Sequence, residues 1–351
     1  MPQIQLANRF IGDNHPAFII AEIGINHQGD VEIAKKLISK AKECGADAVK
    51  FQKRNLERIL TKQGMEMPYE NSNSFGKTYG EHKKVLELSN KDYHTIFQYC
   101  LEKDIIFCAS GWDEDSIDFL DQLGVKFFKM ASADLTNLPL IKHTAKLGKP
   151  IILSTGMADL EMVITAYETV KKINEKVAIM QCTSTYPTDF IELNLNVLSS
   201  FKEKFPKAVI GYSGHELGIA ITSAAVALGA KIIERHFTLD RTMKGGDHAA
   251  SLEPQGFAKL VRDIHAVEAA MGSSEKQVQE SELPVFRKLS KSLVTLKPIK
   301  SGESITADML TTKGPGTGIS PAKMDIVIGK VANRDLLEDE VINEEDIQWK
   351  N

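Results

Sequence analysis

The chain has 351 residues, of which 42% are hydrophobic and 26% are charged, a composition typical of a globular protein that folds in water. This length exceeds what one compact core usually holds, so one large domain and one smaller domain are expected. The formal net charge of -4 disfavours nucleic acid or an anionic membrane as a partner, although a local cluster of lysines can still bind a small anion.

A short apolar run followed by an amphipathic helical stretch recurs between residues 17 and 236. Helical periodicity follows most runs, for example at residues 30–44, 113–123, 159–173 and 216–228. Eight repeats are the number expected of a closed parallel (β/α)8 TIM barrel, an α/β fold. An open doubly wound sheet is the alternative, but no GxGxxG fingerprint follows the first run. The runs begin near residues 17, 47, 105, 126, 150, 177, 208 and 231.

Beyond the last run the sequence predicts a helix at residues 254–271. From residue 293 onward, short β-like runs separated by turns replace the alternation of apolar runs and helices. We predict a catalytic barrel at residues 1–275, a polar linker at 276–292 and a small β-rich domain at 293–351. Residues 302–310 weakly repeat at 339–347, which predicts two similar halves about a pseudo-twofold axis. Residues 56–86 are predicted to form a long irregular loop, of the kind that is usually functional or mobile.

The cysteines and the N-terminal residues bear on the cellular compartment. Cys44, Cys100, Cys108 and Cys182 form no CxxC pair and are interpreted as buried free thiols, as expected in a reducing compartment. No basic stretch precedes a long apolar run, because the best early run, residues 17–21, ends at Glu22. The protein is therefore expected to remain in the cytoplasm.

Polar residues at the C-terminal ends of parallel barrel strands face the catalytic mouth. Lys50 and Lys129 lie inside apolar runs, which favours a functional role over a solvated surface position. Two ammonium groups and several hydroxyls around one mouth would suit a small molecule that carries carboxylate and phosphate. The polar residues at the strand ends are Glu22, Lys50, Gln52, Ser110, Lys129, Ser132, Asp134, Ser154, Thr155, Gln181, Thr183, Ser184, Tyr186, Ser213, His215, Glu234 and His236.

Two of these residues form a candidate metal site. His215 and His236 end the seventh and eighth strands, so their imidazoles are expected in one neighbourhood. With water or substrate oxygens, such a pair can hold a divalent metal, and a purely structural role is the alternative. Glu234 and Asp247 are candidates for a third or supporting ligand, although strand alternation was expected to turn Glu234 outward. His27 is expected to orient the loop after the first strand.

Eight sequence blocks resemble the sialic acid synthases, in the same order and over almost the whole chain. The segment from Ser292 onward resembles the antifreeze-protein-like domain that these enzymes carry. GKTYGEHK and GYSGHE are most similar to the animal-type members that form a 9-phosphate, whereas bacterial synthases of sialic, legionaminic and pseudaminic acids share the other blocks. The eight blocks are AEIGINHQGD, KFQK, GKTYGEHK, STGM, QCTSTYP, GYSGHE, ERHFTLD and GGDHAASLEP.

The resemblance implies a transferase that condenses phosphoenolpyruvate with open-chain N-acetylmannosamine or its 6-phosphate, with C–O cleavage and phosphate release. A legionaminic or pseudaminic acid synthase with the same chemistry is the alternative. The resemblance also implies Mn²⁺ or Mg²⁺ on His215 and His236, and a homodimer in which each small domain covers the partner's active site. Glu22, Lys129 and the two histidines are the implied catalytic residues. The expected substrate contacts are Lys50, Gln52, Ser110, Ser132, Asp134, Ser154, Thr183, Ser184, Tyr186, Ser213 and Asp247.

One position departs from the family pattern. Many bacterial members carry an arginine in an RPGxG loop of the small domain, where it reaches the N-acyl group of the sugar. Residues 313–318 read KGPGTG here, with Gly314 at the place of that arginine. The contact is therefore lost or taken over by Lys313.

Two other classes of function are alternatives to a synthase. A Schiff-base aldolase with Lys129 or Lys50 as nucleophile would need no metal, so the two strand-end histidines count against it. A non-catalytic sugar- or ice-binding protein would use the barrel as a scaffold. Such a binder has no reason to gather two lysines, a carboxylate and two histidines at one mouth.

Overall fold

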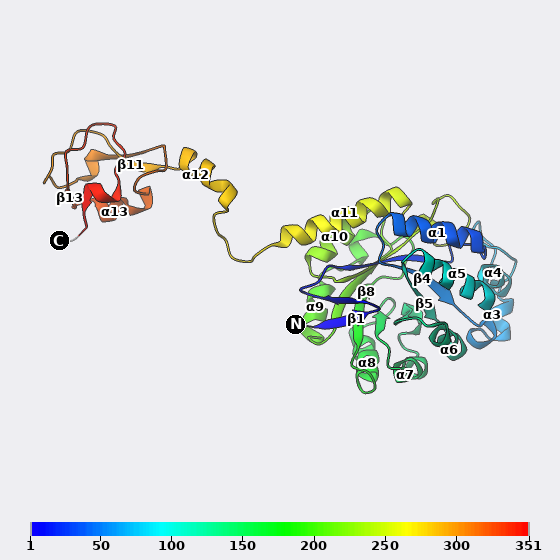
Figure 1. The fold of residues 1–351 in the computed structure, drawn as a ribbon. Helices are drawn as coiled ribbons and strands as arrows, with labels where there is room; N and C mark the ends of the chain where they lie inside the picture. The colour runs from blue at the N-terminus through cyan, green and yellow to red at the C-terminus, as the bar shows by residue number, and fades with distance from the viewer. Residues whose placement is uncertain (1, 350–351) are drawn as a thin grey trace. The chain divides into compact units, whose positions relative to one another are not determined.

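The computed structural model describes residues 2–349, and the chain divides into two compact units, residues 1–272 and 273–351. The first unit is a closed barrel of eight parallel strands with helices on its outside (Figure 1). Each strand pairs with the next along the chain, and the last closes on the first, so the predicted (β/α)8 barrel is confirmed. The strands are β3 (Phe18–Gly24), β4 (Ala48–Lys53), β5 (Ile106–Gly111), β6 (Phe128–Met130), β7 (Ile151–Ser154), β8 (Val177–Cys182), β9 (Val209–Gly214) and β10 (Ile232–His236).

The helices around the barrel follow the expected amphipathic pattern. In the first of them, Asp30 accepts hydrogen bonds from two backbone N–H groups and caps the N-terminus. Ala34, Leu37, Ile38 and Ala41 recur at helical spacing and are buried against the strands. The helices are α1 (Val31–Glu43), α5 (Asn90–Glu102), α6 (Glu114–Leu123), α7 (Leu138–Lys146), α8 (Leu160–Lys171), α9 (Val197–Lys204), α10 (Ala220–Ala227) and α11 (Pro254–Met271).

Strand alternation separates the core into two clusters. In β3, Ile19 and Ala21 pack with the outer helices, whereas Phe18 and Ile20 fill the barrel interior. An antiparallel hairpin of β1 (Gln3–Leu6) and β2 (Arg9–Gly12) adds apolar side chains, including Leu6, to this interior cluster. The hairpin was not predicted. It packs against the N-terminal part of the barrel interior, so the C-terminal ends of the strands are left for polar side chains.

Residues 56–86 are not the irregular loop that the sequence predicted. They form α2 (Leu56–Ile59), α3 (Lys62–Glu66) and α4 (Tyr79–Leu86), which lie beside the barrel rim in Figure 1. The Thr78 hydroxyl and the Glu81 carboxylate cap α4 reciprocally, in a capping box. Neither α2 nor α3 buries any of its residues, so these helices have no apolar periodicity to detect.

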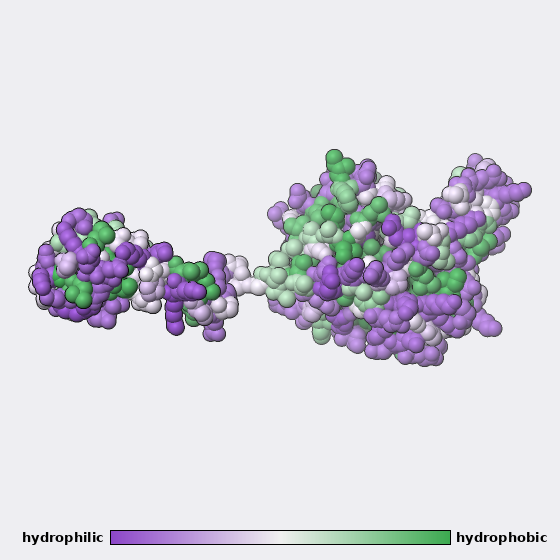
Figure 2. Space-filling model, turned by 90° about the horizontal axis from the view of Figure 1, so that it is seen from above, coloured by the Kyte–Doolittle hydropathy of each residue, from purple (hydrophilic) through white to green (hydrophobic). Residues whose placement is uncertain are grey.

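The second unit has a small core of its own and two short antiparallel sheets. The predicted repeat is visible in its backbone, because a 3-10 turn leads into a strand in both halves, and both Gly302 and Asp339 have positive φ. Its N-terminal helix exposes Phe286 and Leu289, and apolar side chains are visible over this helix in Figure 2. The elements are α12 (Leu283–Leu289), β11 (Ser292–Thr295), β12 (Leu310–Lys313), α13 (Met324–Val327), β13 (Val331–Ala332) and β14 (Ile347–Gln348).

Two further findings bear on the compartment. None of the helices formed by residues 2–349 has both the length and the apolarity that a membrane crossing requires. All four cysteines are free, as predicted, and three are buried, whereas Cys44 is only partly covered.

Candidate active site

A cavity of about 110 Å³ opens where the barrel strands end. Every strand, or the loop that follows it, contributes at least one polar side chain to its wall. This is the position that the parallel barrel predicts for a catalytic mouth. The predicted residues that line it are Glu22, Lys50, Gln52, Ser110, Lys129, Ser132, Ser154, Ser184, Tyr186, Ser213, His215, Glu234 and His236.

Two buried lysines and two buried carboxylates form one charged network in this cavity. Lys50 Nζ lies 2.9 Å from Glu22 Oε2 and 3.5 Å from Glu234 Oε1, and Lys129 Nζ lies 3.2 Å from Glu234 Oε2. Burial alone would raise the pKa of Glu234, but Lys129 and Lys50 hold it at about 2. Burial raises the pKa of Glu22 to about 7 although Lys50 opposes the shift. Glu234 is therefore the permanent anion that bridges both ammonium groups.

The inward position of Glu234 corrects the expectation that it would turn outward. Glu234 and His236 are two residues apart on β10, so alternation places both side chains on the same face. The residue between them, Arg235, points the other way and forms an ion pair with Glu216 in which neither side chain is exposed.

Serine hydroxyls surround the lysines and form a cradle of donors. Ser154 Oγ lies 3.0 Å from Lys129 Nζ, and Ser132 Oγ accepts a hydrogen bond from the backbone N–H of Gly156 at 3.0 Å. A Cβ at position 156 would lie 2.0 Å from Ser184 Oγ and 2.8 Å from Ser132 Oγ. Only glycine in the STGM block therefore leaves room for both hydroxyls.

The two predicted metal-binding histidines are neighbours, with ring centroids 5.2 Å apart. His215 Nδ1 lies 2.7 Å from the carbonyl oxygen of Thr183, which places the proton on Nδ1 and leaves Nε2 for another partner. Burial lowers the pKa of His236 to about 3, and its buried Nδ1 has no hydrogen-bond partner within residues 2–349. Two neighbouring imidazoles, of which that of His236 is neutral, fit a divalent metal. No group of three His, Cys, Asp or Glu residues in the described part of the chain is arranged to hold one, so water or substrate oxygens would complete the shell.

A third group of side chains extends from the histidines towards the outer wall. Asp247 Oδ2 lies 3.5 Å from His236 Nδ1, and Gln52 Nε2 donates to Glu22 Oε1 at 2.9 Å. Gly24 has a φ of +54°, and a Cβ there would lie about 3.1 Å from Gln52 and Glu22 and 3.2 Å from Asp247. The backbone at Gly24 thus permits these three side chains to meet beside the histidine pair.

Some predicted residues lie outside the cavity. Asp134 lines a neighbouring cavity, and the Thr183 hydroxyl donates to the backbone of Glu192, although the Thr183 carbonyl orients His215. The side chains of Thr155 and Gln181 also bond to backbone carbonyls. Asp134, Thr155 and Thr183 come after the ends of β6, β7 and β8, where strand alternation no longer fixes the side-chain direction. Gln181 lies within β8, and alternation turns it away from the interior because its neighbour Met180 faces inward.

The structure adds cavity residues that sequence reasoning missed. Trp112, Met157 and Cys182 line the cavity. Cys182 lies beside His215, and although burial would raise the pKa of its thiol, that contact lowers it to about 7. The available signal was its position in the QCTSTYP block, between the predicted strand-end residues Gln181 and Thr183.

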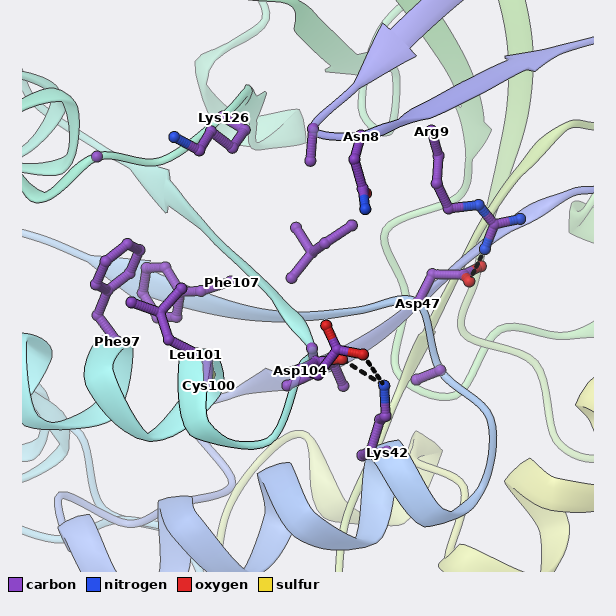
Figure 3. Close-up of a pocket in the computed structure, with 15 residues that line it drawn as sticks. Asn8, Arg9, Lys42, Asp47, Phe97, Cys100, Leu101, Asp104, Phe107 and Lys126 are labelled. Carbon is purple, nitrogen blue, oxygen red and sulfur yellow. Dashed lines mark hydrogen bonds and ion pairs between the residues drawn. The ribbon is translucent and has the colours of Figure 1, made fainter.

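A larger cavity, of about 530 Å³, lies at the opposite end of the barrel (Figure 3). Its charged groups are largely paired, Arg9 with Asp47 and Lys42 with Asp104, and its other wall is formed by apolar side chains such as Phe97. None of the predicted catalytic or binding residues lines it. The smaller cavity at the strand ends is therefore the candidate active site.

Family comparisons agree with this geometry. The NeuB family model matches residues 37–276, and the SAF domain model matches residues 290–348. The chain belongs to the NeuB family. Among NeuB-related proteins, N-acetylneuraminate-9-phosphate synthase of Mus musculus is 47% identical over 97% of this chain and 95% of its own length. The N,N'-diacetyllegionaminic acid synthase of Campylobacter jejuni is 42% identical over 93% of this chain and 98% of its own length.

The solved structures agree with this assignment. The N-acetylneuraminic acid (sialic acid) synthetase of Leptospira borgpetersenii superimposes with a TM-score of 0.71 at 35% identity, covering 81% of this chain and 94% of that chain. This NeuB-family chain is therefore an enzyme with a TIM barrel and a C-terminal SAF domain.

Proposed function

We propose that this NeuB-family enzyme condenses phosphoenolpyruvate with N-acetylmannosamine or its 6-phosphate. The bond between C2 of phosphoenolpyruvate and its bridging oxygen breaks, and inorganic phosphate is released. The observation that carries the proposal is a single cavity in which Lys50, Lys129 and a serine cradle face the His215–His236 pair. A legionaminic or pseudaminic acid synthase would share this chemistry, and the synthases of Mus musculus and Campylobacter jejuni span both alternatives.

Phosphoenolpyruvate would bind in the basic half of the cavity. The ammonium groups of Lys50 and Lys129 neutralise its carboxylate and phosphate, and the hydroxyls of Ser110, Ser154 and the other serines donate to the remaining oxygens. Both lysines are nearly fully buried, so their charges act in a region of low polarity, where they stabilise an anion more strongly than in water.

A divalent metal, Mn²⁺ or Mg²⁺, would be held by His215 and His236. When bound, it would act as a Lewis acid that polarises a carbonyl oxygen of the acceptor. The Thr183 carbonyl orients His215, and Asp247 lies beside His236, so each imidazole has a supporting group. Gln52 and Tyr186 line the cavity, Asp247 lies beside His236, and these three side chains would orient the amino sugar.

Glu22 would act on the carbon of phosphoenolpyruvate that becomes electron-poor. When the CH2 carbon of phosphoenolpyruvate attacks the aldehyde, positive charge develops at its C2. The Glu22 carboxylate can stabilise this charge or orient the water molecule that adds to it. Gln52 donates to Glu22 Oε1 and Lys50 lies 2.9 Å from Glu22 Oε2, so the carboxylate is held in one orientation. Holding both substrates in one cavity lowers the barrier further.

We also propose a cytoplasmic homodimer in which each SAF domain covers the partner's active site. The four free cysteines support the reducing compartment. The role of the lid in recognising the N-acyl group is reduced, because Gly314 stands at the family's arginine position and Lys313 forms an ion pair with Asp339 of its own domain.

The direct test is a phosphate-release assay with phosphoenolpyruvate and a panel of acceptors: N-acetylmannosamine, its 6-phosphate, and the legionaminic and pseudaminic acid precursors. Metal-dependent phosphate release with either mannosamine acceptor is expected. Phosphate release only with another precursor would favour the alternative substrates. Trapping of pyruvate on a lysine by borohydride would instead indicate a Schiff-base aldolase.

The bond that breaks can be identified with an isotope. With heavy oxygen at the bridging position of phosphoenolpyruvate, the label is expected in the released phosphate, because water adds at C2 and the C–O bond then breaks. Mass spectrometry of both products is the measurement. A label that stays in the sugar acid would show P–O cleavage and would contradict the proposed sequence of steps.

A further inference from the structure

A second cavity, of about 220 Å³, adjoins the active-site cavity. Trp112 and Ala133 line both cavities, so the two spaces meet across these residues. Half of its lining residues come from residues 56–86, including Tyr79 and Lys83 of α4, and Arg54, directly after β4, also lines it. Arg54, Tyr79 and Lys83 have no role in the chemistry proposed above.

Two cations lie in the wall, and of these only Arg54 forms an ion pair with a residue of the described range 2–349. Arg54 is 3% exposed, its Nε lies 3.2 Å from Glu87 Oε2, and its guanidinium lies over the ring of Trp112. Lys83 Nζ has no hydrogen bond or ion pair with any residue from 2 to 349, and its near contact is the ring of Tyr79, 5.1 Å from the centroid. A partly buried ammonium group that forms no ion pair is costly, and such groups mark functional sites.

The cavity also contains unused hydrogen-bonding groups. The indole N–H of Trp112 is buried and has no partner among the described residues. Asp134 also lines the wall with one unpaired oxygen, and burial raises the pKa of its carboxyl to about 6. A ligand with several acceptor oxygens would satisfy Lys83, Arg54 and the indole, and it would meet Asp134 most favourably in its protonated form.

The cavity is connected to the acceptor side of the active site. Arg54 Nη2 donates to Gln52 Oε1 at 3.0 Å, and Gln52 also contacts Glu22. Asp247 lies beside His236 and is close enough to Lys83 to act on its charge. An acceptor whose aldehyde lies at the histidine pair therefore extends along Gln52 and Asp247 towards this cavity.

We propose that Lys83, Arg54 and Trp112 form the binding site for a phosphate group on C6 of the acceptor sugar, the end opposite its aldehyde. This inference rests on the proposed condensation and narrows it: the substrate is the 6-phosphate of an N-acylmannosamine. Lys77, another lysine of the same segment, is exposed and does not line the cavity.

The test compares kcat/KM for N-acetylmannosamine 6-phosphate with kcat/KM for N-acetylmannosamine in the full-length enzyme. Wild-type enzyme is expected to prefer the phosphate. Lys83→Met should reduce that preference by roughly 10- to 100-fold, as expected for one charged contact, and Lys83→Arg should retain much of it. Lys83 is the better position to change because Arg54 also holds Glu87 and Gln52. Lys77→Met, on the same segment, is the matched control and should keep the wild-type preference.

The outcomes separate the two levels of the proposal. A wild-type enzyme that releases phosphate with neither acceptor would refute the condensation itself. A wild-type enzyme that condenses both but prefers the unphosphorylated sugar would overturn the phosphate site alone. A Lys83→Met variant with the same preference as Lys77→Met would also overturn it.

A second prediction concerns stability and needs no substrate. Burial, reinforced by the charge of Arg54, lowers the pKa of Lys83 to about 8, whereas Asp247 and Glu87 oppose the shift. The folded state therefore loses stability as pH falls from 10.5 to about 8, and the full cost remains below pH 8, where the partly buried group carries a charge that the unfolded chain holds in water. Lys83→Met should raise the melting temperature of the barrel at pH 7 by roughly 2–4 °C or more.

The pH dependence gives the control for this measurement. The advantage of Lys83→Met should shrink between pH 8 and pH 10.5, because Lys83 becomes neutral in both states. Lys77→Met should show no such trend. A Lys83→Met variant that is less stable than wild type at pH 7 would mean that the ammonium has a structural partner, and it would overturn the cavity as an anion site.

Discussion

His236→Ala is expected to lose turnover by on the order of 10³-fold while the barrel remains folded, because a Lewis acid supplies several kcal/mol of charge stabilisation. His236 Nδ1 has no hydrogen-bond partner within residues 2–349, so its removal leaves no protein group without a hydrogen bond to that atom. His215→Ala should have a similar effect, with an additional cost from the lost bond to the Thr183 carbonyl. The measurements are kcat with saturating Mn²⁺ and calorimetric titration of Mn²⁺ into each variant.

His265→Ala is the matched control, because His265 is exposed on α11 and lies outside the cavity. It should bind Mn²⁺ and turn over as wild type does. If His236→Ala remained active in buffer freed of divalent metal, the metal assignment would be wrong and a metal-independent route would have to be considered. If it stayed inactive but still bound Mn²⁺ with wild-type affinity, the histidine would have a role other than metal binding.

The barrel was predictable because its strands are buried on both faces and appear as nearly continuous apolar runs. Phe18–Gly24 is an example, in which all seven residues are buried. The N-terminal hairpin was missed because each strand has only four residues, too few for alternation to stand out. The helices of residues 56–86 were missed because α2 and α3 bury nothing and therefore have no apolar face.

The candidate site was predictable where a residue ends a strand and less so beyond it. Lys50, Lys129 and His236 lie on regular strands, so their direction follows from the two-residue period. Asp134 lies in a 3-10 turn after β6, where that period has ended, and its side chain lines the adjoining cavity instead. Arg54 and Lys83 are 29 positions apart in sequence, and only the fold of α4 against the barrel rim brings them together.

Lys129→Met is expected to reduce kcat/KM for phosphoenolpyruvate by on the order of 10³-fold, because the variant lacks one of two buried charges that face the anion. Lys129 is 2% exposed and contacts both Ser154 and Glu234. The same change leaves Glu234 with Lys50 as its remaining ammonium partner. Breaking a buried ion pair commonly costs about 3–5 kcal/mol of folding free energy, so activity loss alone would not separate catalysis from stability.

The double variant Lys129→Met/Glu234→Gln separates these two effects. It removes the unmatched carboxylate together with the lysine, so the free energy of unfolding should return towards the wild-type value. Turnover should not return, because the ammonium group that would face phosphoenolpyruvate is still missing. Lys126→Met, an exposed position three residues earlier, serves as the control for both measurements. If the double variant regained wild-type kcat/KM for phosphoenolpyruvate, Lys129 would serve only to neutralise Glu234, and Lys50 with the serine cradle would have to bind the anion alone.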